Sequence, residues 1–207
     1  DRPSPLRAVV DTLVGAIVKR RAHGQRHGVA VIAEGIAAVL EEGALEGAYT
    51  RGKDGRLKLS SIRLGDILAE AVEKELLRFG IESSIVSKDI GYEVRSAEPI
   101  PYDMEYTRDL GYCAARYLCE GGSGAMVTMQ GGRFVPIPFA DMRDPETGGT
   151  RVRLVDVQAE RYKIARRYML RLRRDDFENQ EQLDKLAQTL RLSVEDFRKE
   201  FEHVVQD

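Results

Sequence analysis

The sequence of 207 residues has little of what marks several classes of protein. It contains two cysteines, three histidines and no tryptophan. Cys113 and Cys119 stand six apart in a segment predicted to be one helix, and no second cysteine pair is present to complete a zinc site. We therefore expect both cysteines to be reduced and buried, as is usual in a reducing compartment.

Long apolar runs and an excess of one charge are also missing. No stretch approaches the roughly 18 apolar residues that cross a bilayer, and the first residues carry no hydrophobic signal core. The 32 basic and 34 acidic side chains give a formal charge of −2, so no overall field favours nucleic acid or an acidic membrane surface. We predict a cytoplasmic protein without a membrane partner, which meets charged ligands through local contacts.

Familiar catalytic signatures are absent as well. His23, His27 and His203 show neither metal-ligand spacing nor a serine or cysteine partner at a recognisable distance. There is no Walker loop, and no glycine fingerprint lies between a strand and a helix. The sequence therefore predicts neither a metal site nor a nucleophile triad.

The hydrophobic pattern that is present alternates between helices and strands. Apolar residues recur at helical spacing over 6–17 and over 64–79. Residues 29–33 form an apolar run without alternation, which is typical of a parallel strand covered by helices on both faces. Residues 81–86 predict a second strand.

The middle of the chain predicts a helix and a hairpin. Asp103 is expected to cap the helix. Residues 125–130 and 133–137 then predict two strands, and Gly131-Gly132 suits the two-residue turn between them.

From Asp156 onward the chain is predicted to be helical, with Ser193 and Asp196 as a capping box for the last helix. The whole pattern predicts an α/β fold, in which a mainly parallel sheet is flanked by helices over residues 1–155. A helical C-terminal segment over residues 156–207 is expected to pack on this lobe.

Glu34 is the first candidate for ligand binding. It directly follows the predicted strand 29–33, and ligands of open α/β sheets collect at the carboxyl ends of the strands. Gly35 lets a ligand approach the backbone closely, and a carboxylate here can accept hydrogen bonds from the hydroxyls of a sugar. The alternative is a glutamate that starts a helix and stabilises its dipole by a few tenths of a kcal/mol to about 1 kcal/mol.

Lys88, Tyr92 and Arg95 form the second candidate, after the predicted strand 81–86. An arginine grips phosphate with a planar pair of donors, a lysine adds a compact charge, and a tyrosine hydroxyl can complete the site. The set suits a dianionic phosphate. The alternative is a solvated loop in which Arg95 pairs with a neighbouring glutamate, a surface ion pair that contributes about 0 to 1 kcal/mol.

Residues 161–174 contain a run of basic side chains without an acidic one. The apolar residues between them recur at helical spacing, so one face is expected to pack and the other to be cationic. Such a face suits nucleic acid or an anionic effector, but it is more often solvated or in contact with acidic residues. We do not predict a nucleic-acid partner.

Four segments, in this order, resemble the second half of a phosphofructokinase, and most of all one of the pyrophosphate-dependent type. They are Ala33-Glu34-Gly35, Lys88-Asp-Ile-Gly-Tyr-Glu-Val-Arg95, Asp109-Leu-Gly-Tyr-Cys-Ala-Ala-Arg-Tyr-Leu118, and the segment 124–139. The resemblance covers about residues 1–175, and it implies the Rossmann-like lobe of the phosphofructokinase fold.

The resemblance also implies roles for the candidate residues. Glu34 matches the family's acid that hydrogen-bonds the hydroxyls of fructose. Tyr92 and Arg95 match the Gly-Tyr-x-x-Arg segment that holds the 6-phosphate, and Lys88 lies where the pyrophosphate branch often has a lysine. The implied ligands are fructose 6-phosphate and a phosphoryl donor, pyrophosphate or ATP, with pyrophosphate favoured.

Other motifs of the family do not occur here. The glycine-rich donor site and the Thr-x-Asp-x-Asp motif, which supplies the base and helps to hold magnesium, belong to the first half. We therefore expect no catalytic residue and no metal ligand in this chain, Mg²⁺ bound mainly by the other half, and no activity from this chain alone. The start at Asp1 without a methionine also suggests a piece of a longer polypeptide. Because family members commonly build sites across subunits, a homo-oligomer, either a dimer or a tetramer, is expected.

Two other functions remain open. The first is a sugar-phosphate sensor or regulatory lobe, which uses the same pocket without turnover. The absence of the acidic base motif from the complete protein would favour this function. An interaction module can act through the basic segment 161–174, and its binding to polyanions is expected to weaken steeply with salt.

Overall fold

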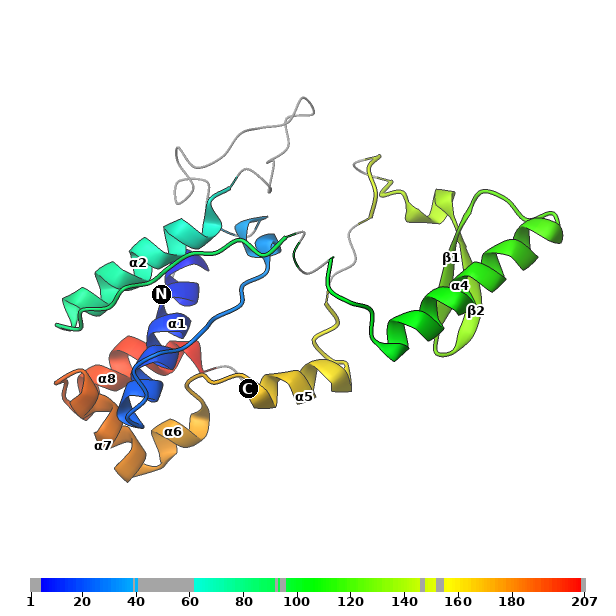
Figure 1. The fold of residues 1–207 in the computed structure, drawn as a ribbon. Coiled ribbons are helices and arrows are strands. Elements are labelled where there is room, and N and C mark those ends of the chain that lie inside the picture. Colours follow the sequence, from blue (N-terminus) through cyan, green and yellow to red (C-terminus); the bar gives the residue numbers. More distant parts are fainter. Residues whose placement is uncertain are drawn as a thin grey trace. The chain divides into compact units, whose positions relative to one another are not determined.

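A computed structural model describes residues 5–38, 40, 62–91, 93, 96–145, 148–151 and 155–205. The chain divides into two compact units. The first unit consists of Asp1–Asp89 and Ile164–Asp207, and the second consists of Ile90–Lys163. Figure 1 shows their elements, which we describe unit by unit.

The first unit is helical where it has regular structure in its described part (Figure 1). Its helices are α1 (Pro5–Ala22), the 3-10 helix η1 (Glu34–Ala38), α2 (Leu64–Arg78), α6 (Arg174–Glu178), α7 (Gln180–Thr189), α8 (Val194–Phe201) and the 3-10 helix η5 (Glu202–Val204). A further helix, α5 (Glu160–Tyr168), crosses the boundary between the units. Among the helices that the structure describes, none is both long enough and apolar enough to span a membrane.

The core of the first unit lies where α1, α2, α7 and α8 pack on one another. It consists chiefly of Val10, Val14, Val18, Leu68, Val72, Leu76, Leu183, Leu186, Phe197 and Phe201. A Cβ on Gly15 of α1 would lie 2.6 Å from Leu172 Cδ1, so glycine permits this close packing. The helical patterns predicted over 6–17 and 64–79 are therefore confirmed, because they form the apolar stripes that meet in this core.

Ser193 is confirmed as the N-cap residue of the last long helix, but Asp196 meets the hydroxyl of Ser193 and not its main-chain amide, so the predicted capping box is formed only in part. The Ser193 Oγ accepts a hydrogen bond from the Asp196 amide at 3.0 Å and donates one to Asp196 Oδ2 at 2.6 Å. These bonds satisfy a free amide at the start of α8 and fix where the helix begins.

The second unit combines one long helix with a hairpin (Figure 1). Its elements are α4 (Pro101–Cys119), β1 (Ala125–Gln130), β2 (Arg133–Pro138) and the 3-10 helix η4 (Phe139–Met142). The strands are antiparallel, and the turn residues Gly131 and Gly132 have φ values of 56° and 75°. These left-handed conformations are those that a primed two-residue turn requires, so the predicted hairpin is confirmed.

Two local predictions in the second unit are wrong. The helix α4 begins at Pro101 with Ile100 as its N-cap residue, and Asp103 instead accepts a hydrogen bond from the Ile100 amide at 3.0 Å. Proline is well suited to a first helical position because it has no amide hydrogen to satisfy. Cys113 is buried as expected, but Cys119 at the end of the helix is exposed.

The predicted parallel sheet is wrong. The hairpin β1–β2 is the only sheet in the described part of the chain, and residues 29–33 and 81–86 carry no strand there. A strand requires the main chain of a neighbour, and neither segment has one among these residues. The apolar runs predict buried strands, yet Val29 is 95% exposed and Val86 is 78% exposed. The prediction of a mainly parallel α/β lobe therefore fails for this chain.

A cluster of ion pairs joins α1 to α2 and to η5. Arg7 donates to Asp11 Oδ2 at 2.7 Å and to Glu75 Oε1 at 2.8 Å, while His203 Nε2 lies 3.0 Å from Asp11 Oδ2. Asp11 is fully buried, and its Oδ1 has no hydrogen-bond partner in the described part of the chain. The side chains of Arg7 and His203 thus both lie at Oδ2 of Asp11, whereas Oδ1 has no partner among the described residues.

Arg78 extends the cluster to α8. Its guanidinium donates to Glu75 Oε1 and to Glu200 Oε2, both at 2.6 Å. Burial opposes the ionisation of Glu75, but the hydrogen bonds from Arg78 and Arg7 outweigh it and hold the pKa of Glu75 below its ordinary value. Burial raises the pKa of Asp11, because its contact with Arg7 does not compensate for the loss of water.

These opposite pKa directions predict opposite effects of removing each charge. Glu75→Gln is expected to lower the free energy of unfolding at about pH 7, whereas Asp11→Asn is expected to cost less or to stabilise the fold. The folded pKa of Glu75 is depressed, so its stabilisation is present above the unfolded pKa, ordinarily 4.5, and is lost as the pH falls through the folded pKa. Urea unfolding of both variants at about pH 7 and about pH 3 measures this. A cost of Glu75→Gln that stays constant between these pH values, or a larger cost for Asp11→Asn, argues against this electrostatic description.

Candidate functional site

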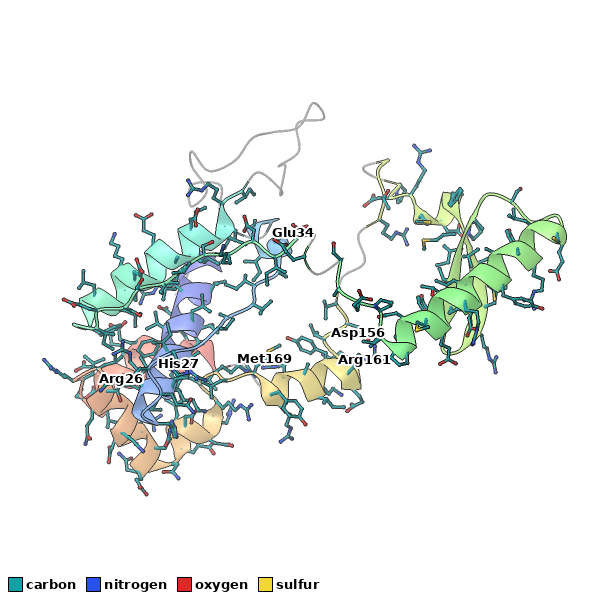
Figure 2. All side chains as sticks on the ribbon, in the orientation of Figure 1. Arg26, His27, Glu34, Asp156, Arg161 and Met169 are labelled. Atoms are coloured by element: carbon teal, nitrogen blue, oxygen red, sulfur yellow. The ribbon has the colours of Figure 1, made fainter. Side chains whose placement is uncertain are left out.

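Glu34 is the first residue of η1 and is exposed (Figure 2). The turn is closed by a main-chain bond in which the Ile36 amide donates to the Ala33 carbonyl at 3.1 Å. Within the described part of the chain, the Glu34 carboxylate has neither a hydrogen bond nor an ion pair. The carboxylate is therefore available to accept hydrogen bonds from a ligand. Glu34 also stands at the start of a helix, which is the position required by the alternative interpretation, a glutamate that stabilises the helix dipole.

Lys88 lies in the extended segment that follows α2. Its side chain is exposed, and no other described residue pairs with it. Glu34 and Lys88 both belong to the first unit, and among the described residues no hydrogen bond links them.

Tyr92 and Arg95, the predicted phosphate ligands, lie outside the described residues. Between them, Glu93 is exposed, and its Oε2 accepts a hydrogen bond from the Gly91 amide at 3.1 Å. Hydrogen bonds from the amides of Glu93 itself and of Gly91 hold the pKa of this carboxyl below its ordinary value. Glu93, which stands between Tyr92 and Arg95 in the sequence, therefore remains an anion, and it is one of the glutamates that the alternative interpretation offers as a partner for Arg95.

The basic segment 161–174 is not one helix. The helix α5 ends at Tyr168, and α6 begins only at Arg174. Between them, Arg173 Nη2 donates to the carbonyls of Arg167 at 2.6 Å and Met169 at 3.2 Å, so its charge helps to close the end of α5. The prediction of a continuous cationic helix face is therefore wrong.

A hollow of about 430 Å³ lies in the first unit and contains none of the four predicted site residues. It is lined by Arg174, Phe177, Glu178, Arg198, Glu202 and Val205. Arg198 donates to Glu202 at 3.1 Å, so charges of both signs lie close together. This arrangement does not select an anionic ligand.

The described residues contain no group of three or more histidine, cysteine, aspartate or glutamate side chains that could hold a metal ion. These residues therefore do not fit a magnesium site of their own, and we assign no reaction step through magnesium to this chain.

The sequence matches no protein-family model. It is 40% identical over 203 residues to a pyrophosphate--fructose 6-phosphate 1-phosphotransferase of Naegleria fowleri, a match that covers 96% of this chain and 46% of the relative. It is 43% identical over 208 residues to a protein of the same name from Thermotoga maritima, covering 97% of this chain and 50% of the relative. An ATP-dependent 6-phosphofructokinase of Amycolatopsis methanolica is 31% identical over 61% of this chain and 28% of its own length.

The two more similar relatives are matched along nearly the whole of this chain, through both units and the helical C-terminal segment. The chain spans about half the length of these curated relatives. It belongs to the phosphofructokinase family as a homologue of the pyrophosphate-dependent members.

Proposed function

We propose that this chain supplies the fructose 6-phosphate side of the cleft in a pyrophosphate-dependent phosphofructokinase. The reaction transfers a phosphoryl group from pyrophosphate to the 1-hydroxyl of fructose 6-phosphate and gives fructose 1,6-bisphosphate. The observation that carries the proposal is the 40–43% identity, along almost the entire chain, to two pyrophosphate--fructose 6-phosphate 1-phosphotransferases. Turnover belongs to the longer protein, and this chain alone is expected to be inactive.

Phosphoryl transfer depends mainly on positioning and charge neutralisation, so the residues that hold the acceptor sugar matter. In the proposal, the Arg95 guanidinium donates a pair of hydrogen bonds to the 6-phosphate, and Lys88 and Tyr92 complete its ligands. Glu34 accepts hydrogen bonds from the fructose hydroxyls, which is supported by its exposed carboxylate, unpaired among the residues that the structure describes. Held at both ends, the sugar presents its 1-hydroxyl to the donor.

Pyrophosphate is the proposed donor because the two relatives matched over nearly the whole chain carry it in their names. The ATP-dependent relative is similar over a smaller part of the chain. Magnesium held mainly by the other half, a homo-oligomer and a cytoplasmic location complete the proposal. The proposal also divides the chain into a sugar-phosphate lobe (1–155) and a C-terminal helical segment (156–207).

An assay of the complete polypeptide tests this function. The chain is fused to the half that the Thermotoga maritima relative has and this chain lacks, and fructose 1,6-bisphosphate is measured with pyrophosphate or with ATP, in the presence of Mg²⁺. Product with pyrophosphate and none from this chain alone is the expected result. Fructose 6-phosphate binding without product from either donor favours a sensor and overturns the proposed reaction.

A further inference from the structure

Residues 82–88 lead from α2 to the proposed phosphate ligands, and they form neither a helix nor a strand. The segment turns back along α2 (Figure 1) and ends at Lys88, the first of the three residues proposed to bind the 6-phosphate. Tyr92 and Arg95 follow shortly after Lys88 in the sequence. The position of this segment therefore determines where the first phosphate ligand lies.

The start of the segment is fixed by the end of α2. The Ile81 amide donates to the Leu76 carbonyl at 2.9 Å, and Ile81 belongs to the hydrophobic core. Gly80 has a φ of 70°, a left-handed conformation that is common directly after a helix and lets the chain change direction. The chain is therefore anchored at the point where it turns back along α2.

A carboxylate of α2 holds the middle of the segment. Glu73 Oε1 accepts a hydrogen bond from the Ile85 amide at 2.6 Å, and Ile85 packs on the hydrophobic core. A hydrogen bond to a charged acceptor is stronger than one between neutral groups. Among the described residues, the one other hydrogen bond to the main chain of 82–88 is longer, from Arg21 Nη2 to the Glu82 carbonyl at 3.3 Å. Glu73 thus makes the shorter of the two polar contacts that hold this segment.

The end of the segment fits against a glycine of α2. A Cβ on Gly65 would overlap Ser87 Oγ and would lie 3.2 Å from Ser87 Cβ. Ser87 is half-buried and the adjacent Lys88 is exposed, because successive side chains of an extended chain point to opposite sides. The contact between Gly65 and Ser87 therefore leaves the Lys88 side chain exposed on the other side of the segment.

We propose that Glu73 and Gly65 are positioning residues for the phosphate ligands of this site. Glu73 holds the main chain shortly before Lys88, and Gly65 leaves the space that Ser87 occupies. Neither residue contacts the sugar phosphate in this proposal. A site that is already ordered before its ligand arrives binds more tightly, because less conformational freedom is lost on binding. The inference rests on the proposed function and adds two residues of α2 to it.

Calorimetric titration of the complete polypeptide, with fructose 6-phosphate and separately with pyrophosphate, tests the role of Glu73. Glu73→Ala removes the acceptor, whereas Glu73→Gln keeps an oxygen that can accept from the Ile85 amide. The matched control is Glu70→Ala, because Glu70 is an exposed acid of α2 without a hydrogen bond or ion pair among the described residues. Thermal midpoints from circular dichroism establish that each variant is folded.

We expect Glu73→Ala to weaken the binding of fructose 6-phosphate about tenfold, less than the roughly hundredfold that a displacement of about 1 Å can cost. Glu73→Gln and Glu70→Ala are expected to bind this ligand like the unchanged polypeptide. The affinity for pyrophosphate should be the same in all of these variants. A purely structural role of Glu73 predicts instead a lower thermal midpoint and equal losses for both ligands.

Gly65→Ala tests the positioning role independently of Glu73. Alanine favours a helix more than glycine does, so the substitution itself suits α2, but its Cβ displaces Ser87. We expect fructose 6-phosphate to bind more weakly by a factor similar to that for Glu73→Ala. Adding Ser87→Ala removes the overlapping hydroxyl and should restore most of this affinity. A double variant that binds no better than Gly65→Ala contradicts the proposal.

The outcomes separate this inference from the function on which it rests. If the unchanged polypeptide binds fructose 6-phosphate and both Glu73→Ala and Gly65→Ala bind it equally well, the positioning role is overturned and the proposed function stands. An equal loss in Glu73→Ala and Glu70→Ala also overturns the positioning role, because it reports a general effect of charge. If the unchanged polypeptide does not bind fructose 6-phosphate, the proposed function fails, and this inference fails with it.

Discussion

Replacing Phe197 with alanine is expected to lower the free energy of unfolding by about 3–5 kcal/mol, the usual cost of removing a buried aromatic side chain. Phe197 of α8 is fully buried, and its ring centroid lies 5.0 Å from that of Phe201 and 5.8 Å from that of Phe177. Because α8 packs on both α1 and α7, the cavity left by the substitution lies where three helices meet.

Urea unfolding followed by far-ultraviolet circular dichroism measures this effect, since the sequence contains no tryptophan to report it by fluorescence. The matched control is Leu77→Ala, because Leu77 is 62% exposed and its truncation is expected to change stability by no more than about 0.5 kcal/mol. A cost below about 1 kcal/mol for Phe197→Ala shows that α8 does not occupy this core.

Replacing Arg95 with alanine in the complete enzyme is expected to raise the KM for fructose 6-phosphate by about 10- to 150-fold. This corresponds to the loss of a charge-assisted contact of about 1.5–3 kcal/mol. The 6-phosphate does not react, so its contact is made equally in the ground state and the transition state. The kcat is therefore expected to change little.

The control for Arg95→Ala is Arg133→Ala, which removes the same charge from an exposed position at the start of β2. Initial rates with each substrate varied in turn separate the KM for the sugar from the KM for pyrophosphate. An unchanged KM for fructose 6-phosphate in Arg95→Ala shows that Arg95 does not bind the sugar phosphate. An equal rise of this KM in Arg133→Ala shows that the loss of any positive charge produces the effect.

The sequence predicted the elements whose causes are local. Gly131-Gly132 defines a turn that needs two left-handed residues, and Ser193 caps α8 through atoms only three residues apart. The apolar stripes of α1 and α2 depend on helical spacing within each segment, and both stripes lie in the core as predicted.

The prediction of a parallel sheet failed because a strand is not a local property. Residues 29–33 and 81–86 have the composition of buried strands, but composition does not provide the neighbouring main chain that a sheet requires. The predicted alternation of strands and helices therefore did not predict the fold of this chain.

The candidate site depended on the resemblance more than on residue types. Glu34 and Lys88 are exposed and unpaired within the described residues, which their types and positions alone did not determine. The charge of Glu93 close to Arg95 in the chain was visible in the sequence and was considered only as a surface partner. In the structure, Glu93 Oε2 accepts a hydrogen bond from the Gly91 amide.

The central claim is that this chain binds the sugar phosphate and the other half binds the donor. Calorimetric titration of the complete polypeptide, unchanged and with Arg95→Ala, tests it directly with fructose 6-phosphate and with pyrophosphate as separate ligands. We predict that the variant loses about 10- to 150-fold in affinity for fructose 6-phosphate and keeps its affinity for pyrophosphate. A loss confined to pyrophosphate, or an equal loss for both ligands, contradicts the assignment.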